Sequence, residues 1–568
     1  MKMRGAKIVW ECLLEQGVDT VFGYPGGTIL NIYDELELGG YNKKVRHILT
    51  AHEQGASHAA DGYARSTGKV GVCFATSGPG ATNLTTGIAT AYYDSSPVVF
   101  ITCNVSENLI GKDSFQEVDI TGITMPITKC NYLVRDVNQL ADVIREAFAI
   151  AGSGRPGPVL IDIAKNATSE EAEFTPLPRS EHASQGRLAA MLRRASHDLK
   201  TPEPDSGDIQ TLLDMIEQSQ RPLVLVGGGV IRSKGAVPEF RKFMETLDAP
   251  VTSTIMGGGA CPGSHPLFTG MIGMHGSHAS NMASNECDLL IAIGCRFSDR
   301  VATDPATFAP NAKIVHIDID RAEIDKNVKT DHHIIGDARR VLELLNEKLP
   351  KHTYPEWKAQ VFARKEIPLK KDNILHAHEV LETIQKVAGD AIIATDVGQH
   401  QMWSAQYFHF SRPGQLITSG GFGTMGFGLG AAMGAKVGNP DQVVVHCTGD
   451  GCFRMNCHEL CTVEHYGLPI ITVIFNNQTL GMVRQWQNLI YEKRFSQTDL
   501  DRGPDFVKLA NAYGIDGARA ATQEEFEAVF RKAVESGKPW VIECAIDKDA
   551  MVHPMVPGGA NVTNFLLD

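Results

Sequence analysis

Short apolar runs alternate with glycine loops and stretches of helical periodicity along most of the chain. Between residues 18 and 165 the apolar runs lie in VDTVFGYPGG, KVGVCFATSGPG, SPVVFITC and GPVLIDI. Near-continuous apolar runs of this length are typical of parallel strands buried on both faces. The alternation therefore predicts an α/β layer built on a parallel sheet.

The same pattern occurs twice more. A second unit starts at RPLVLVGGGV, and a third has strand candidates in AIIATDVG, QVVVHCTGDG, PIITVIFNN and PWVIECAID. Stretches rich in charge, Ser and Pro separate the units and are typical of linkers. We predict an α/β fold with three doubly wound parallel-sheet domains, at 1–165, 210–349 and 374–568, joined by linkers at 166–209 and 350–373.

Two glycine patterns suggest that the outer domains are related. SGPGATNLTTGIA and GGFGTMGFGLGAA share their glycine and alanine spacing at an offset of 343 positions. Chance matching remains an alternative, because the chain holds 55 glycines. If the match is real, two related sheets place glycine loops around one ligand at the carboxyl ends of their strands. The matched positions are Gly78 and Gly421, Gly80 and Gly423, Gly87 and Gly430, and Ala89 and Ala432.

Composition narrows the classes of function. The 568 residues are enough for roughly three domains of about 150 residues. A net charge of −13 argues against nucleic acid as the main partner. Twelve cysteines lie scattered through apolar runs without metal-ligand spacing, which predicts buried reduced thiols and a reducing compartment. Neither a signal peptide nor a membrane-length apolar stretch occurs, so we predict a cytoplasmic protein that does not bind membranes.

The segment TGDGCFRMN contains the first candidate for site chemistry. Asp450 could be only a turn residue, but it follows one predicted strand, and Asn477 follows the next, 27 positions later. One β-α-β crossover therefore brings two oxygen ligands to the same sheet edge, where they suit a hard cation that also binds phosphate. Gly449 and Gly451 let backbone N–H groups approach a diphosphate.

The pattern from GDG to NN resembles the binding motif of thiamin-diphosphate enzymes. That resemblance implies that Glu53, in the matching HEQGA segment, is the acid at the pyrimidine N1′ of the cofactor. It also implies that Met425 bends the cofactor into its V shape and that the Gly423 carbonyl accepts the 4′-amino group.

Within that superfamily the chain resembles acetohydroxyacid synthase catalytic subunits nearly from end to end. The most specific segments are FQE, GMHG, RQWQ and PMVPGGA. The resemblance implies decarboxylation of pyruvate on thiamin diphosphate and transfer of the hydroxyethyl carbanion to a second 2-oxoacid, pyruvate or 2-oxobutyrate. The product is 2-acetolactate or 2-aceto-2-hydroxybutyrate, as in branched-chain amino acid synthesis. It also implies a homodimer or homotetramer with active sites at subunit interfaces, and a small regulatory subunit.

Matching positions give the implied site. The catalytic residues are Glu53, Gln116, Lys165, Arg300 and Trp486, with Arg300 binding the acceptor carboxylate and Trp486 overhanging the acceptor site. Phe115, Met274 and Val483 line the substrate channel, and Asp450, Asn477 and Thr479 bind Mg²⁺. The other thiamin diphosphate residues are Pro25, Gly26, Pro79, Asn83, Val397, Gly398, Gln399, His400, Gly423, Met425, Gly449, Gly451, Cys452, Gly481 and Met482.

The central domain resembles the FAD-binding domain of these synthases, with a flavin in a structural role. The acidic residues Asp318 and Asp320 follow a strand and suit ribose hydroxyls. The implied FAD residues are Arg155, Gly227, Gly228, Thr254, Gly273, His275, Gly294, Arg296, Asp318, Ile319, Gly336 and Asp337.

Alternative functions stay open at this stage. They are an FAD-free catabolic acetolactate synthase, glyoxylate carboligase, a pyruvate oxidase-like flavoprotein and a non-catalytic paralogue. The RQWQ segment and Glu53 argue against the first two. Ser106, Ser298, Gly430 and His458 differ from the residues usual in the synthases.

Overall fold

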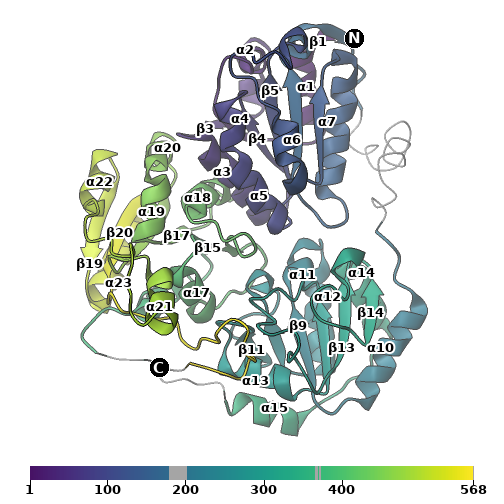
Figure 1. Cartoon of the computed structure of the whole chain (residues 1–568), viewed down its shortest axis with the longest axis vertical. Helices are drawn as coiled ribbons and strands as arrows, with labels where there is room; N and C mark the ends of the chain where they lie inside the picture. Colours follow the sequence, from purple (N-terminus) through teal and green to yellow (C-terminus); the bar gives the residue numbers. More distant parts are fainter. Residues whose placement is uncertain (178–200, 365–368, 370–371, 567–568) are drawn as a thin grey trace. The chain divides into compact units, whose positions relative to one another are not determined.

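The computed structural model describes residues 1–177, 201–364, 369 and 372–566 (Figure 1). Parts of both predicted linkers, residues 178–200, 365–368 and 370–371, lie outside the described residues. Three six-stranded sheets are flanked by helices, and every strand pairing given for them is parallel. The prediction of an α/β chain with three parallel-sheet domains is therefore confirmed.

The N-terminal sheet has the strand order β3-β2-β4-β5-β7-β6. Strand β5 is buried along its whole length, as its mostly apolar sequence predicts. Helices α1, α2 and α7 pack on one face around Trp10 and Phe74, whereas α3 packs on the other, where the Tyr63 ring meets Phe22. The strands are β2 (Thr20–Gly23), β3 (Arg46–Leu49), β4 (Gly71–Ala75), β5 (Val98–Asn104), β6 (Cys130–Val134) and β7 (Val159–Ala164). The helices are α1 (Gly5–Glu15), α2 (Leu30–Leu38), α3 (Glu53–Thr67), α4 (Pro79–Asn83), α5 (Thr85–Tyr93), α6 (Ile120–Thr124) and α7 (Val137–Gly152).

Two short elements near this sheet were not predicted. β1 (Lys2–Arg4) pairs antiparallel with β8 (Glu171–Glu173), which follows helix α8 (Lys165–Ser169). All of β8 and most of α8 fall in the stretch 166–209 that was predicted as a linker. Strands of three residues carry too few positions to show a period.

The central sheet has the order β11-β10-β9-β12-β13-β14, a dinucleotide-type order in which the chain reverses direction between β9 and β12. Alternate residues of β9 face opposite cores: Leu223 packs with α13 and α15, whereas Val224 packs with α10, α12 and α14. The strands are β9 (Pro222–Val226), β10 (Val251–Ser253), β11 (Phe268–Met271), β12 (Leu289–Ile293), β13 (Lys313–Asp318) and β14 (His332–Ile335). The helices are α10 (Ser206–Gln218), α11 (Gly228–Arg232), α12 (Ala236–Leu247), α13 (His278–Glu286), α14 (Ala338–Lys348) and α15 (Pro355–Phe362).

The C-terminal sheet has the order β16-β15-β17-β18-β20-β19. Its strands are β15 (Ile392–Thr395), β16 (Leu416–Ile417), β17 (Val444–Gly449), β18 (Ile470–Asn476), β19 (Asp516–Ala520) and β20 (Trp540–Ala545). The helices in this part of the chain are α16 (Ala377–Ala388), α17 (Gln399–Tyr407), α18 (Phe427–Gly438), α19 (Asp450–Asn456), α20 (Leu460–His465), α21 (Gly481–Ile490), α22 (Phe506–Ala512) and α23 (Gln523–Ser536).

The outer sheets have the same strand order and thus the same topology. In chain order within each sheet, both run 2-1-3-4-6-5. The glycine match, however, paired the wrong loops: Gly78 follows the third strand of its sheet, whereas Gly421 follows the second strand of the other. The third strands begin at Gly71 and Val444, which are 373 positions apart and not 343. Similar glycine spacing in two different loops produced the mistaken offset.

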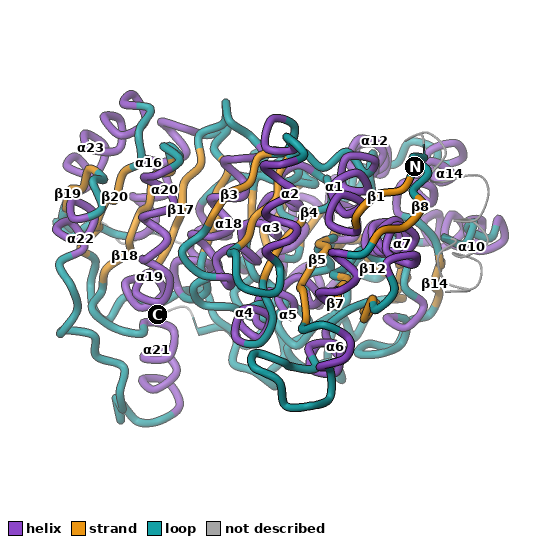
Figure 2. Tube along the Cα trace, turned by 90° about the horizontal axis from the view of Figure 1, so that it is seen from above, coloured by secondary structure: helices purple, strands orange, loops and turns teal. Residues whose placement is uncertain are grey.

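By contacts the chain divides into two compact units. The first contains residues 1–200, 419–441 and 454–470, and the second contains 201–418, 442–453 and 471–568. Within the first unit α18 lies directly on α3 (Figures 1 and 2). A Cβ atom on Gly434 of α18 would stand 1.8 Å from the Ala59 carbonyl oxygen of α3, so the close packing of these two helices requires glycine at this position.

A buried ion network lies in the same unit. The Arg65 Nε donates to Asp61 Oδ1 at 2.6 Å, and the Arg65 Nη2 donates to Asp94 Oδ2 at 3.0 Å. All three side chains are almost fully buried. Because a buried charge left without its partner is costly, this network connects α3 firmly to the segment after α5.

The twelve cysteines are all free thiols, and most are buried, as predicted. Burial raises the pKa of the Cys447 thiol to about 12, which keeps that thiol protonated at neutral pH. Among the described residues no helix is both long enough and apolar enough to cross a lipid bilayer.

Candidate functional site

Three loops meet at the carboxyl-terminal edge of the C-terminal sheet, one each after β15, β17 and β18. The Asn477 Nδ2 donates to the Gln399 Oε1 at 3.2 Å, and the Cys452 Sγ donates to the Val397 carbonyl at 3.2 Å. Asp450, Asn477 and Thr479 are all buried at this edge. The predicted metal ligands and the predicted diphosphate residues are thus brought together within the second unit.

Glycines let these loops approach one another closely. A Cβ on Gly481 would stand 2.0 Å from Gln399 Oε1, and one on Gly449 would stand 3.0 Å from His400 Nδ1. Backbone N–H groups can therefore line the loops without side chains in front of them. A carboxylate, an amide oxygen and exposed backbone groups are the donor set that Mg²⁺ and a diphosphate require, so these residues fit that pair.

A buried network supports the loops from below. The Thr448 hydroxyl donates to Asp396 Oδ2 at 2.7 Å, and His446 Nε2 lies 3.0 Å from the same oxygen. Burial lowers the pKa of His400 to about 4, so its ring is neutral at pH 7. Asp396 and His446 were not identified from the sequence, although Asp396 directly precedes the predicted residue Val397.

Glu53 is the first residue of α3 and directly follows His52, which caps the helix. Its side chain is 9% exposed, and its Oε2 accepts from the Asn83 Nδ2 at 2.9 Å. A Cβ on Gly80 would lie 3.2 Å from Glu53 Oε1, and one on Gly78 would lie 2.9 Å from the Gln116 carbonyl oxygen. The loop after β4 therefore brings Glu53, Asn83 and Gln116 together.

The loop after β2 joins the same cluster. A Cβ on Gly26 would stand 2.5 Å from the Thr76 side chain, so Pro25 and Gly26 lie against the segment that leads into Gly78. Lys165 begins α8 at the end of β7, and both Lys165 and Phe115 have exposed side chains.

The segment that carries Gly423 and Met425 is fixed to the end of α5. The Gly421 N–H donates to Asp94 Oδ1 at 2.7 Å, and the Thr424 and Thr90 hydroxyls are 2.7 Å apart. The Phe422 ring stacks on Tyr93 with centroids 5.2 Å apart. Gly423 is exposed and Met425 is half-buried, so both present groups that a ligand can reach.

The central sheet has a glycine crevice where its strand order reverses. The Gly229 N–H donates to the Gly294 carbonyl at 3.0 Å, and a Cβ on Gly227 would stand 2.1 Å from that oxygen. Open α/β sheets bind dinucleotides at this position, and Asp318 ends the adjacent strand β13 with a buried carboxylate. These residues fit an FAD. Arg155, by contrast, lies in the first unit, where its Nε donates to Ser95 Oγ at 2.9 Å.

Two predicted FAD and ribose residues already have local partners. Asp320 accepts from the Ala322 N–H, and Asp337 accepts from the Arg339 N–H and from the Ser233 hydroxyl. These carboxylates cap the following helical turns, a role that Asp at such positions often has.

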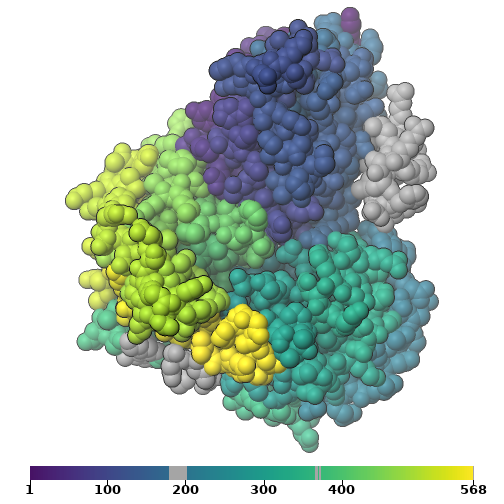
Figure 3. All heavy atoms as spheres, viewed as in Figure 1, coloured from purple at the N-terminus to yellow at the C-terminus, as the bar shows by residue number. Residues whose placement is uncertain are grey.

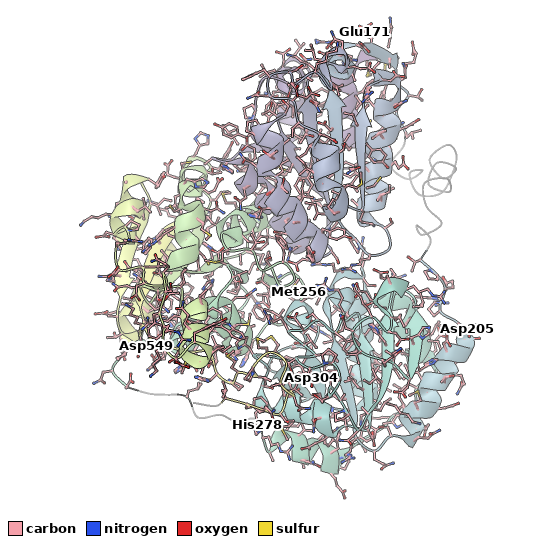
Figure 4. All side chains as sticks on the ribbon, in the orientation of Figure 1. Glu171, Asp205, Met256, His278, Asp304 and Asp549 are labelled. Carbon is pink, nitrogen blue, oxygen red and sulfur yellow. The ribbon has the colours of Figure 1, made fainter. Side chains whose placement is uncertain are left out.

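The Arg300 region connects to the C-terminal tail. The Met274 N–H donates to the Arg300 carbonyl at 2.9 Å, and the Val556 N–H donates to the Met274 carbonyl at 2.7 Å. Figure 3 shows the tail lying over the surface of the central sheet domain, and Figure 4 shows His278, whose ring lies 5.0 Å from that of Phe565. The PMVPGGA segment thus contacts the predicted channel residue Met274, which in turn binds the backbone of Arg300.

Gln485 is a central residue of this unit that the sequence did not single out, although it lies inside RQWQ. It accepts from Gln399 Nε2 at 3.0 Å and from the Val552 N–H at 2.9 Å, and it is 2% exposed. The same helix presents a half-buried Trp486 and an Arg484 paired with Asp549 (Figure 4). Gln485 therefore links the loops of the sheet edge to the tail.

Comparison with known proteins gives a consistent family. Three thiamine pyrophosphate enzyme models match the chain: the N-terminal TPP binding domain at 3–123, the central domain at 209–345 and the C-terminal TPP binding domain at 396–544. A probable acetolactate synthase large subunit of Methanocaldococcus jannaschii is 45% identical over 99% of this chain and 95% of its own length. The acetolactate synthase isozyme 2 large subunit of Escherichia coli is 43% identical over 99% of both chains. The acetolactate synthase large subunit of Parasynechococcus marenigrum is 46% identical over 98% of this chain and 89% of its own length.

Proposed function

The chain belongs to the thiamine pyrophosphate enzymes, and among them to the acetolactate synthase large subunits, and from this premise we propose how its residues carry out the reaction. It is an acetohydroxyacid synthase. Pyruvate is the proposed donor, and a second pyruvate or 2-oxobutyrate is the proposed acceptor. The observation that supports this best is the meeting of the Asp396–His400, Gly449–Cys452 and Asn477–Gly481 loops at one sheet edge.

Asp450, Asn477 and Thr479 would hold a Mg²⁺ ion and through it the diphosphate of the cofactor. When bound, thiamin diphosphate supplies a carbon nucleophile and accepts the electrons that carbon dioxide leaves behind. Glu53 would share a proton with the pyrimidine N1′, and the burial of its carboxyl group excludes water from that contact. The Gly423 carbonyl would accept from the 4′-amino group.

Arg300 would bind the acceptor carboxylate through its guanidinium group, which is exposed and close to Met274 Sδ. Gln116, Lys165, Phe115, Met274 and Val483 remain the proposed lining of the substrate path.

The basic activity is tested by incubating the purified protein with pyruvate and identifying the product by mass, with thiamin diphosphate, Mg²⁺ or FAD omitted in turn. We expect acetolactate only when thiamin diphosphate and Mg²⁺ are both present. Release of acetate or acetaldehyde in place of acetolactate would contradict the proposed transfer to a second 2-oxoacid.

Trp486 is proposed to set the acceptor preference, because a half-buried indole can pack on the extra methylene of 2-oxobutyrate. One such methylene is worth about 1 to 3 kcal/mol, roughly 10- to 200-fold in partitioning. Trp486→Leu should lose much of the preference for 2-oxobutyrate and still make acetolactate from pyruvate alone. Competition with both oxoacids measures the product ratio directly. Tyr491→Leu, at an exposed aromatic that ends the same helix, is the control, and an equal ratio in the two variants would assign Trp486 to packing.

FAD is proposed to bind at the glycine crevice of the central sheet as a structural group. A methyl group at Gly227 would collide with the Gly294 carbonyl, so Gly227→Ala should purify without flavin. We expect the visible flavin spectrum to disappear and the far-ultraviolet circular dichroism to stay unchanged. Gly152→Ala, where a Cβ meets only the Val70 side chain at 4.0 Å, is the matched control. Full flavin content in Gly227→Ala would place the FAD elsewhere.

The assembly and compartment are further proposals. We propose a homodimer or homotetramer, which sedimentation of the loaded enzyme tests. The relatives are named large subunits, so we also propose a small regulatory subunit as a partner. Free thiols at all twelve cysteines favour the cytoplasm.

A further inference from the structure

The residues after the Gly-Asp-Gly turn form two short helices separated by a tighter helical turn. Helix α19 ends at Asn456, a 3₁₀ turn covers Cys457–Glu459, and α20 begins at Leu460. The turn points Glu459 inward, and its side chain is 0% exposed. A fully buried glutamate is uncommon unless its oxygens are satisfied, so its partners are informative.

Both carboxylate oxygens of Glu459 bind the backbone just before Glu53. Oε2 accepts from the Ala51 N–H at 3.0 Å, and Oε1 accepts from the His52 N–H at 3.1 Å. The Thr462 hydroxyl also donates to Oε2, at 2.7 Å. Two consecutive amides that donate to one carboxyl group leave the intervening backbone little freedom, because a shift of the backbone would leave a buried group without its partner.

These amides stand at the start of α3, whose first residue is Glu53. A carboxylate at this end of a helix is also favoured by the helix dipole. The His52 side chain caps the same turn by accepting from the Gln54 N–H at 3.1 Å. The first turn of α3, which includes the backbone of Glu53, is therefore held both by Glu459 and by the His52 side chain.

Gly55 provides the space for this arrangement. A Cβ on Gly55 would stand 1.9 Å from Glu459 Oε1 and 2.5 Å from Glu459 Cδ. The backbone at Gly55 is ordinary helix, so glycine is needed there for space and not for conformation. The glycine of the HEQGA segment, Gly55, is thus needed because the Glu459 carboxyl group, more than 400 positions away along the chain, occupies the space beside it.

We infer that Glu459 is a positioning residue for Glu53: it fixes the backbone at Ala51 and His52 and thereby the place of the Glu53 carboxyl group. This inference rests on the proposed role of Glu53 at the cofactor pyrimidine. Burial raises the pKa of Glu459, and the hydrogen bonds from Ala51, Thr462 and His52 offset part of this rise. A misplacement of about 1 Å can cost about 10²-fold in rate.

Two variants alter the contact from opposite sides. Glu459→Gln keeps the size of the side chain but can accept from only one of the two amides, and Gly55→Ala pushes the carboxylate away. We expect faster hydrogen exchange of the Ala51 and His52 amides in the cofactor-free protein. With thiamin diphosphate and Mg²⁺ bound, we expect exchange of the cofactor C2 proton to slow about 10- to 100-fold in each variant. The double variant should be no slower than the slower single one, because both changes act through one contact.

Thr462→Val is the matched control, because it removes a hydrogen bond of Glu459 and leaves those to Ala51 and His52. It should exchange the C2 proton within twofold of the wild type. If Glu53→Gln exchanges slowly while Glu459→Gln and Gly55→Ala match the wild type, the positioning role is overturned and the role of Glu53 stands. If Glu53→Gln also exchanges at the wild-type rate, the proposed role of Glu53 falls, and the positioning inference falls with it.

Discussion

Glu53→Gln is expected to slow removal of the cofactor C2 proton by about 10² to 10⁴, the usual cost of losing a positioned acid-base group. Glutamine keeps an oxygen that can accept from the Asn83 Nδ2, so the fold and the binding of thiamin diphosphate should be preserved. It cannot share a proton with the pyrimidine N1′, and that is the property the reaction requires.

Deuterium exchange at C2 and the rate of acetolactate formation measure the effect. Glu146→Gln is the control, because Glu146 is another buried glutamate of the same unit, on α7. Its exchange rate should equal that of the wild type. Wild-type exchange in Glu53→Gln would remove this glutamate from the mechanism.

Asp450→Ala is expected to weaken binding of Mg²⁺ and thiamin diphosphate together. The buried carboxylate is the proposed charge partner of the ion, and removing one partner of a buried charge pair costs about 3 to 5 kcal/mol, roughly 10²- to 4 × 10³-fold in affinity. Calorimetric titration with thiamin diphosphate at fixed Mg²⁺, and then the reverse titration, gives both constants. Asp441→Ala, at an exposed aspartate just before β17, should bind both as the wild type does. A change in one affinity without the other would count against a shared site.

The main strands and the loops between them could be predicted because their signals are local. Runs such as VVFITC are mostly apolar, since both faces of β5 are buried, and Asp450 and Asn477 directly follow the strands formed by two other such runs. Strand β16 was missed because it has only two residues, and β19 because it lies at the sheet edge and is mostly half-exposed.

The parts that escaped prediction depend on contacts between distant segments. Glu459 lies in a sequence with ordinary helical spacing, and nothing nearby indicates that its partners are the amides of Ala51 and His52. Gln485 was quoted within a motif, but its connection to the tail follows only from the position of Val552. Local periodicity carries no information on such pairs.

The composition of the first compact unit has a consequence for biosynthesis. Residues 419–441 and 454–470 complete a unit whose sheet is made from the first third of the chain. The partner of the Ala51 amide, Glu459, lies 408 positions downstream in the chain. At translation rates of roughly 5 to 20 residues per second, it is synthesised about 20 to 80 s after Ala51. During that interval the α3 surface that later receives Gly430 and Gly434 is uncovered. A nascent chain stalled before residue 419 should therefore retain chaperones on this surface, and one released after residue 470 should not.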